Sequence, residues 1–148
     1  MPTSTPPADT AQELFDVWHR VWKATHEVFG AAGLSMSRAK ALWALDAEGP
    51  LRARALADRF GCAAATVTDL VDGLERDGYV TRTPDPSDRR AVLISITPAG
   101  RAAGASARER KRAVLDAVFA ALRPDEREHL SRLLRRLADS PILNGATP

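Results

Sequence analysis

Apolar residues recur at intervals of three and four over most of the chain, and this spacing predicts amphipathic helices. Residues that can cap a helix precede several of these stretches, and Gly or Pro follows them. The pattern predicts six helices, over residues 9–29, 35–46, 52–60, 63–77, 98–122 and 127–139. Asp9, Ser35 and Thr97 are the expected N-caps of the first, second and fifth of these helices.

One segment breaks the helical spacing. The short runs 79–83 and 91–96 are rich in β-prone residues, and in the second run Val92, Ile94 and Ile96 alternate with Leu93, Ser95 and Thr97, which is the period of a half-buried β-strand. The sequence between them, Pro84-Asp-Pro-Ser-Asp88, is rich in residues that favour turns. We therefore expect a mainly α fold with one small β-hairpin.

The arrangement of these elements points to a class of fold. Helices 52–60 and 63–77, joined by a turn at Gly61-Cys62, have the proportions of a helix-turn-helix. The hairpin follows at once and carries two arginines at the exit of its turn, which is the form of a DNA-binding wing. The sequence predicts a winged helix-turn-helix with helix 63–77 in the major groove of DNA.

The face of helix 63–77 that would meet DNA lies opposite the residues expected to be buried, which are Val67, Leu70, Val71 and Leu74. It is poor in positive charge, so arginines elsewhere must attract the phosphates. Arg89 and Arg90 suit a narrow minor groove, and Asp88 is placed to orient one of them. The predicted DNA-contacting residues are Arg52, Arg54, Ala65, Thr66, Thr68, Asp69, Arg76, Arg82, Asp88, Arg89 and Arg90.

Asp69 has two opposite interpretations. Its carboxylate can accept a hydrogen bond from the N4 amino group of cytosine in the major groove. Alternatively, Asp69 repels the phosphates of DNA or pairs with a neighbouring arginine. The sequence leaves both interpretations open.

Composition adds little to this picture. The chain has 148 residues, 45% hydrophobic and 27% charged, as expected of one globular domain with or without extended arms. The net charge is only +2, and residues 1–34, 35–100 and 101–148 carry −2, zero and +4. We expect the same three segments to be an N-terminal tail and dimerisation helix, the DNA-binding lobe, and C-terminal dimerisation helices with a tail. Arginine supplies 18 of the 21 basic residues, which suits phosphate contacts but also fits an arginine-rich genome.

Several classes of protein are disfavoured. No apolar run approaches the length of a membrane helix, and the N-terminus lacks the pattern of a secretory signal. The single cysteine, Cys62, excludes an intramolecular disulfide, so we expect a cytoplasmic protein. We find no catalytic triad, paired carboxylates, phosphate-binding loop or metal-ligand spacing, and expect neither an enzyme nor a cofactor nor a metal. Cys62 is interpreted as a turn residue rather than a redox sensor, and His19 and His26 as solvated or core residues.

The first and last helices carry apolar stripes with no obvious third layer to cover them. The clearest stripe consists of Leu130, Leu133, Leu134 and Leu137. Two copies that pack such stripes together would bury them, which predicts a homodimer. Packing within the chain is the alternative.

The wing and the helix before it resemble the multiple antibiotic resistance regulator (MarR) family. The family's Asp-x-Arg, alternating strand and Leu-Thr-x-x-Gly are similar to Asp88-Arg-Arg-Ala-Val-Leu-Ile-Ser-Ile-Thr-Pro-Ala-Gly100, with Ile96 in the Leu position. The run from Thr66 to Val80 resembles the family's recognition helix and its exit, and Leu34-Ser35 resembles the start of its second helix.

This resemblance implies a dimeric, sequence-specific regulator, and we expect a repressor that responds to a ligand. Each recognition helix would enter the major groove of a palindromic operator and each wing the minor groove, with Arg90 and Asp88 in the positions of the motif. Asp69 and Gly73 depart from the family, which often has basic or neutral polar residues there. A winged-helix module that binds protein instead of DNA is the alternative, and the acidic helix face favours it.

The family resemblance also implies an effector. Many members bind small aromatic or anionic molecules between the dimer helices and the DNA-binding lobe. The candidate contacts in this chain are Trp18, Trp22 and Trp43. Core packing is the alternative for all three.

Overall fold

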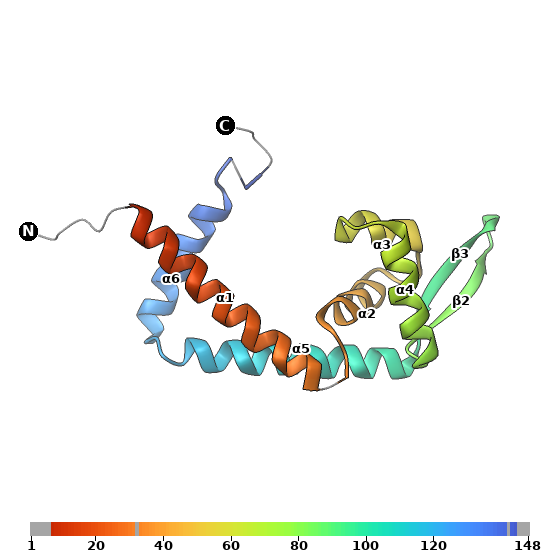
Figure 1. Cartoon of the computed structure of the whole chain (residues 1–148), viewed down its shortest axis with the longest axis horizontal. Helices are drawn as coiled ribbons and strands as arrows, with labels where there is room; N and C mark the ends of the chain where they lie inside the picture. The colour runs from red at the N-terminus through yellow and green to blue at the C-terminus, as the bar shows by residue number, and fades with distance from the viewer. Residues whose placement is uncertain (1–6, 32, 142, 145–148) are drawn as a thin grey trace, which may run out of the picture. The chain divides into compact units, whose positions relative to one another are not determined.

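The computed structural model describes residues 7–31, 33–141 and 143–144. The described residues divide into two compact units, one ending at Arg112 and the other beginning at Ala113. The elements, all but β1 labelled in Figure 1, are α1 (Pro7–Ala31), α2 (Met36–Glu48), β1 (Leu51–Arg52), α3 (Ala53–Phe60), α4 (Ala64–Arg76), β2 (Val80–Asp85), β3 (Asp88–Ile96), α5 (Pro98–Phe119) and α6 (Pro124–Ala138). The predicted mainly α winged helix-turn-helix is confirmed.

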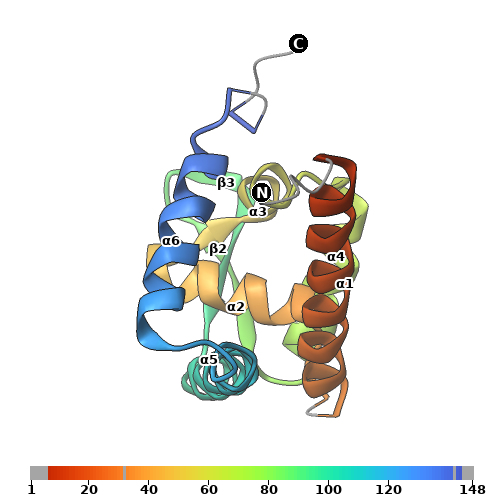
Figure 2. The same ribbon diagram turned by 90° about the vertical axis from the view of Figure 1, so that its left-hand side faces the viewer.

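The core of the first unit lies where α2, α3, α4 and the small sheet meet. Leu42 of α2, Leu56 of α3, Leu74 of α4 and Ile94 of β3 are all buried there. Phe29, near the end of α1, packs into the same core. Helix α2 runs at a steep angle to α1 (Figures 1 and 2). Burying each of these side chains contributes roughly 1.5–3 kcal/mol. The core therefore holds one face of α4 firmly and leaves the opposite face in solvent.

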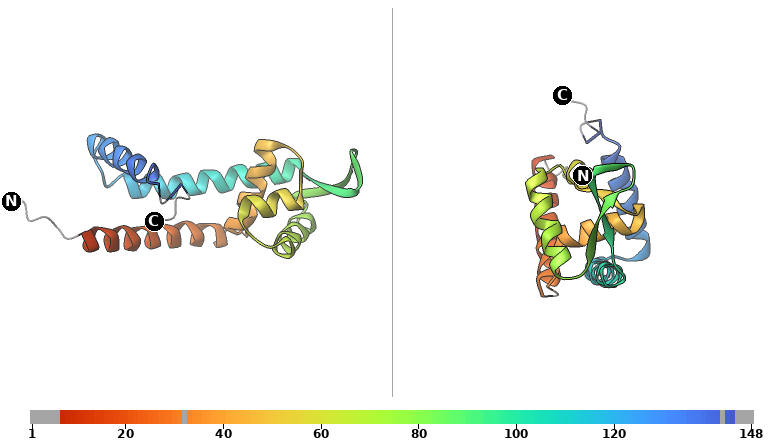
Figure 3. Two further views of the ribbon diagram at one scale, coloured as in Figure 1. Left: turned by 90° about the horizontal axis from the view of Figure 1, so that it is seen from above. Right: turned by 90° about the vertical axis from the view of Figure 1, so that its right-hand side faces the viewer.

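The sheet has three antiparallel strands in the order β1-β3-β2. Strand β1 pairs Leu51 with Ile94 and Arg52 with Leu93. The helix predicted over residues 52–60 is present as α3, but it begins one residue later, because Arg52 belongs to a two-residue strand that is too short to show a period of two. Strands β2 and β3 form the predicted hairpin, which extends beyond the helices of its unit (Figure 3).

The hairpin is longer than predicted and its turn is shorter. Pro84 pairs with Val92 and Asp85 with Asp88, so only residues 86 and 87 lie between the strands. All of residues 84–88 were expected in the turn, because two prolines and two aspartates are typical of turns. An irregularity in the register between Pro84 and Asp85 accommodates these residues within the strand.

The helix ends agree with most of the predicted caps. Ser35 caps α2, and its hydroxyl accepts a hydrogen bond of 3.3 Å from the backbone N–H of Arg38. Asp9 is not an N-cap, because α1 begins at Pro7 and Asp9 lies in its first turn.

Two helix boundaries differ from those predicted. Helix α5 ends at Phe119 instead of residue 122. Residues 124–126, which were expected to separate two helices, form the first turn of α6, since proline is favoured at that position.

The base of the hairpin is fixed to the start of α5 by a compact set of hydrogen bonds. The Thr97 hydroxyl donates to the Gly78 carbonyl at 2.7 Å and accepts from the Gly100 N–H at 3.0 Å. The Thr97 N–H donates to the Tyr79 carbonyl at 3.0 Å. A Cβ at residue 100 would collide with that same Tyr79 carbonyl oxygen. This close approach is the physical reason for glycine in the Thr-x-x-Gly motif.

The second unit contains the end of α5 and α6. In α6 the Glu126 carboxylate accepts from the Arg123 N–H at 2.8 Å, which satisfies one free donor at the helix start. Leu133, Leu134 and Leu137 of the predicted stripe are all exposed in the single chain.

Candidate nucleic-acid interface

Helices α3 and α4 form the helix-turn-helix. Gly61 ends α3 with φ of 60° and ψ of 35°, a left-handed conformation that glycine adopts without strain, and this sets the tight turn into α4. Val67, Val71 and Leu74 are buried as predicted, whereas Leu70, also expected to be buried, is only half-buried. The residues predicted to contact DNA from this helix all have exposed side chains: Ala65, Thr66, Thr68, Asp69 and Arg76.

An arginine of the wing neutralises two carboxylates of α4. The Arg82 guanidinium on β2 donates hydrogen bonds to Asp72 and Glu75. Burial alone would lower the pKa of Arg82, but the hydrogen bonds to these two carboxylates raise it. Arg82 was predicted to contact phosphate. That contact stays a prediction, and the structure shows that the guanidinium already has two partners within the fold.

A second arginine, which was not among the predicted site residues, holds the C-terminal end of α4 from its other flank. Arg38 of α2 donates to the Gly73 carbonyl at 2.9 Å and to the Asp77 carboxylate, and its guanidinium lies over the Tyr79 ring. Its side chain is only 19% exposed. A cation at the C-terminus of a helix is stabilised by the helix dipole. No local pattern marks this contact, because 35 residues separate Arg38 from Gly73.

The tip of the wing is held by a buried carboxylate. Asp85 accepts from the Ser87 N–H at 2.8 Å and hydroxyl at 2.7 Å, and from the Arg52 Nε at 2.8 Å. These hydrogen bonds, with those from Ser87 the larger cause, lower the pKa of Asp85 from 3.8 to about 2. The Asp-x-Ser spacing is that of an Asx turn and could have indicated this role.

Arg52 and Asp88 are also engaged within the wing. Arg52 pairs with Asp85 and lies 3.8 Å from the Asp88 carboxylate. Asp88 accepts from the backbone N–H of Arg90 at 3.1 Å. Asp88 was expected to orient an arginine side chain of the tip. In the structure its contacts are to the Arg90 backbone and to Arg52, so it shapes the strand that carries the tip arginines.

Four of the predicted arginines remain available to a ligand. Arg89 and Arg90 at the tip and Arg76 at the end of α4 are exposed, and within the described residues no carboxylate pairs with their side chains. Arg54 at the start of α3 is 91% exposed, and its only described ion pair is with Asp58 at 4.0 Å. Among the described residues, Arg76, Arg89 and Arg90 therefore supply the unpaired positive charge of the helix-turn-helix and wing, and the highly exposed Arg54 adds to it.

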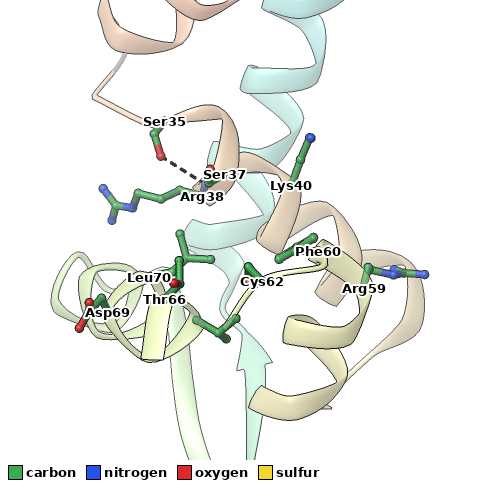
Figure 4. Close-up of a pocket in the computed structure, with 11 residues that line it drawn as sticks. Ser35, Ser37, Arg38, Lys40, Arg59, Phe60, Cys62, Thr66, Asp69 and Leu70 are labelled. Carbon is green, nitrogen blue, oxygen red and sulfur yellow. Dashed lines mark hydrogen bonds between the residues drawn. The ribbon is translucent and has the colours of Figure 1, made fainter. Parts of the chain in front are cut away.

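A groove of about 570 Å³ lies between the N-terminal half of α2 and the turn from α3 to α4 (Figure 4). Phe60, Cys62 and Leu70 line it, and the Lys40 and Arg59 side chains point outward at its edge. Cys62 lies in the turn, as predicted, and is half-buried.

The three tryptophans predicted to contact an effector have different surroundings. Trp18 and Trp22 are exposed on α1, and Trp22 lies against the ring of His26. Trp43 is packed in the fold, where its indole N–H donates to the Gly104 carbonyl at 2.7 Å. Arg108 and Lys111 lie over the Trp43 ring at 5.6 and 5.5 Å from its centroid. The polar atom of Trp43 is therefore already engaged, and effector binding by all three residues stays a prediction.

The part of the chain that the structure describes was searched for membrane-spanning helices and for metal sites. Within it we find no helix long and apolar enough to cross a membrane. His, Cys, Asp and Glu side chains in the same residues form no group of three that could hold a metal ion.

Known proteins similar to this chain share its helix-turn-helix. A family model described as "MarR family" matches residues 34–92. The transcriptional repressor YetL of Bacillus subtilis is 37% identical over 91 residues, which are 60% of this chain and 54% of YetL, so the match spans about half of that relative. The uncharacterized transcriptional regulator YwaE of Bacillus subtilis is 30% identical over 80% of this chain and 69% of its own length.

Solved structures give the same result. One of them is the structure of BpsR from Bordetella bronchiseptica, with a TM-score of 0.69 and 25% sequence identity. That structure concerns the mechanism by which 6-hydroxynicotinic acid regulates the DNA binding of BpsR. The match covers 88% of this chain and 93% of BpsR. The prediction that the chain is not an enzyme agrees with these relatives, which are transcriptional regulators. The chain belongs to the MarR family of winged helix-turn-helix transcriptional regulators.

Proposed function

We propose that this protein is a cytoplasmic, homodimeric transcriptional repressor that binds a palindromic DNA operator. Helix α4 enters the major groove of each half-site and the wing enters the adjacent minor groove. The observation that carries this proposal is the exposed tip of the wing, where Arg89 and Arg90 have no carboxylate partner within the described residues. Guanidinium groups at such a position are attracted to the negative potential of a narrow minor groove.

The surroundings of α4 support DNA over a protein partner. In the sequence alone, the acidic face of this helix favours a module that binds protein instead of DNA. Asp72 and Glu75 are paired with Arg82, and Asp77 is paired with Arg38. Most of the negative charge near the exposed face of α4 is therefore neutralised by the protein itself.

Exposed apolar residues support the dimer. On α1 Leu14, Phe15, Val17 and Trp18 are exposed, and Leu133, Leu134 and Leu137 are exposed on α6. Apolar residues at this density on a helix surface are typical of an interface. A two-fold symmetric dimer would also match the symmetry of a palindromic operator.

Repression and response to an effector are supported by relatives. YetL is a transcriptional repressor, and the DNA binding of BpsR is regulated by the small aromatic acid 6-hydroxynicotinic acid. We propose that a small aromatic or anionic effector likewise changes the affinity of this protein for its operator, with Trp18 and Trp22 near the site. An effector must bind one conformation of the dimer more tightly than the other to have this effect.

The test is an electrophoretic mobility shift with the full-length protein and the DNA upstream of its own gene. We expect a shift that Arg90→Ala weakens markedly, with the circular dichroism spectrum unchanged. Arg136→Ala, which removes an exposed arginine of α6, is the matched control and should bind like wild type. Failure of the wild-type protein to shift any genomic fragment would contradict the proposal and favour a protein-binding module.

A further inference from the structure

One carboxylate of α4 differs from its neighbours. Asp72 and Glu75 are paired with Arg82, and Asp77, which caps the helix, is paired with Arg38. Asp69 is exposed, and within the described residues its carboxylate makes neither a hydrogen bond nor an ion pair. The pairing of Asp69 with a neighbouring arginine, one part of the second interpretation that the sequence left open, is therefore not formed, which leaves recognition of cytosine and repulsion of phosphates.

The position of Asp69 relative to the two paired arginines is informative. Successive residues of a helix are rotated by about 100°, so Asp72 and Glu75 lie on one flank of α4 and Gly73 and Asp77 on the other. Arg82 covers the first flank and Arg38 the second.

Asp69 lies between these flanks, opposite the buried residues Val67 and Val71. Figure 4 shows its carboxylate pointing away from Phe60 and Cys62. It is in the first half of the helix, the part that contacts base edges when such a helix enters the major groove.

The chemistry of the major groove selects one base for a carboxylate at this position. Cytosine presents only the N4 amino donor, whereas adenine presents its N6 donor beside the N7 acceptor. Guanine and thymine present only acceptors for hydrogen bonds, and these repel a carboxylate. A carboxylate therefore gains a hydrogen bond at cytosine and meets an acceptor at each of the other three bases.

We propose that Asp69 is a specificity-determining residue that accepts a hydrogen bond from cytosine N4 and thereby fixes a C·G pair at one position of each operator half-site. This inference rests on the proposed DNA-binding function. Asp69 contributes specificity both through the bond to cytosine and through repulsion of the other bases. Attraction to the backbone comes from the unpaired arginines, chiefly Arg89, Arg90 and Arg76.

The experiment is selection of random duplexes by the full-length wild type, Asp69→Ala and Asp69→Asn, followed by affinity measurements on the selected duplexes. We expect the wild type to enrich cytosine at one position per half-site. Replacing that C·G pair by T·A should weaken wild-type binding by about 5- to 150-fold. The same replacement should change binding of Asp69→Ala by less than about 2-fold, because the discriminating group is absent.

Asp69→Asn provides a gain-of-preference test. Asparagine recognises adenine through N6 and N7, so this variant should enrich adenine where the wild type enriches cytosine. Asp58→Ala is the matched control, because Asp58 is an exposed carboxylate on α3 and its removal changes the net charge equally. It should change the affinity for all duplexes alike and leave the preferred bases unchanged.

The outcomes separate this inference from the proposed function. If the wild type selects duplexes but Asp69→Ala selects the same bases, Asp69 does not read the operator and the inference is wrong. A uniform gain in affinity of Asp69→Ala for every duplex would show that Asp69 only repels DNA, which also overturns it. If the wild type enriches no duplex at all, the proposed function itself fails and the inference fails with it.

Discussion

The Arg82 guanidinium on β2 and the Asp72 carboxylate on α4 form an ion pair that joins the wing to the helix proposed to read the operator. Glu75 of α4 pairs with the same guanidinium. Arg82 therefore neutralises two carboxylates of this helix and also fixes the helix against the wing.

We predict that Arg82→Ala lowers the free energy of unfolding by about 1–2 kcal/mol, since it leaves two carboxylates without their hydrogen-bond donor. The same variant should bind DNA more weakly, because Asp72 and Glu75 would then repel phosphates. Urea unfolding followed by circular dichroism measures the first effect. Arg54→Ala, at an almost fully exposed site, should change stability by less than about 0.5 kcal/mol. Equal losses in both variants would show that the Arg82 pairs do not stabilise the fold.

We predict a pH effect from Asp85, whose pKa is about 2 against an ordinary 3.8. A carboxyl group whose pKa is lowered by folding stabilises the protein above its ordinary pKa, and this contribution is lost as the pH falls from about 4 through 2. Asp85→Asn should therefore be less stable than wild type at pH 6, and the difference should shrink between pH 4 and pH 2. Asp58→Asn, at an exposed site, should follow the wild-type curve. A constant difference between Asp85→Asn and wild type over this range would contradict the assignment.

We predict opposite effects of alanine at two glycines. Gly100→Ala places a Cβ against the Tyr79 carbonyl and should destabilise the protein by about 1–3 kcal/mol. Gly73→Ala enters open space within a helix and should stabilise it by roughly 0.5–1 kcal/mol. Thermal or urea unfolding of both variants tests the pair. Tolerance of Gly100→Ala would mean that the joint between wing and α5 can relax.

We predict that the wild type is a dimer at micromolar concentration, with a mass twice the 16.0 kDa of one chain. Leu137→Glu puts a charge into the exposed apolar stripe of α6 and should shift the protein to monomer. Light scattering after size-exclusion chromatography measures both masses. Arg136→Glu changes a neighbouring residue outside the stripe and should stay dimeric. A monomeric wild type would contradict the proposed dimer.

We predict that DNA binding weakens steeply with salt, because each neutralised phosphate contributes about −0.9 to the slope of log K against log salt. Arg90→Ala should reduce the size of this slope by about 1 per wing, since one phosphate or groove contact is lost. Fluorescence anisotropy at several salt concentrations measures the slope. An unchanged slope in Arg90→Ala would show that this arginine does not contact DNA.

The sequence was sufficient to predict the elements that depend on local patterns. The spacing of Val67, Val71 and Leu74 predicted α4 and its buried face, and the alternation around Ile94 predicted the hairpin. The combination of the two predicted the fold and the family.

The contacts that position the site could not be predicted in the same way. Arg38 reaches Gly73 and Asp77 only because α2 and the end of α4 pack together in three dimensions. Arg52 was predicted to contact phosphate, but it pairs with Asp85 across the sheet. A single arginine looks the same in sequence whether it faces solvent or a carboxylate 33 residues away.

The residues that hold α4 and the residues on its open face are different sets. Arg38 and Arg82 hold its flanks, while the side chains of Ala65 and Asp69 make no hydrogen bond or ion pair within the described residues. Substitutions at 65 and 69 therefore cost the fold little, and they change the surface offered to the bases. In evolution, this protein could acquire a new operator by mutation at these two positions without first gaining stability elsewhere.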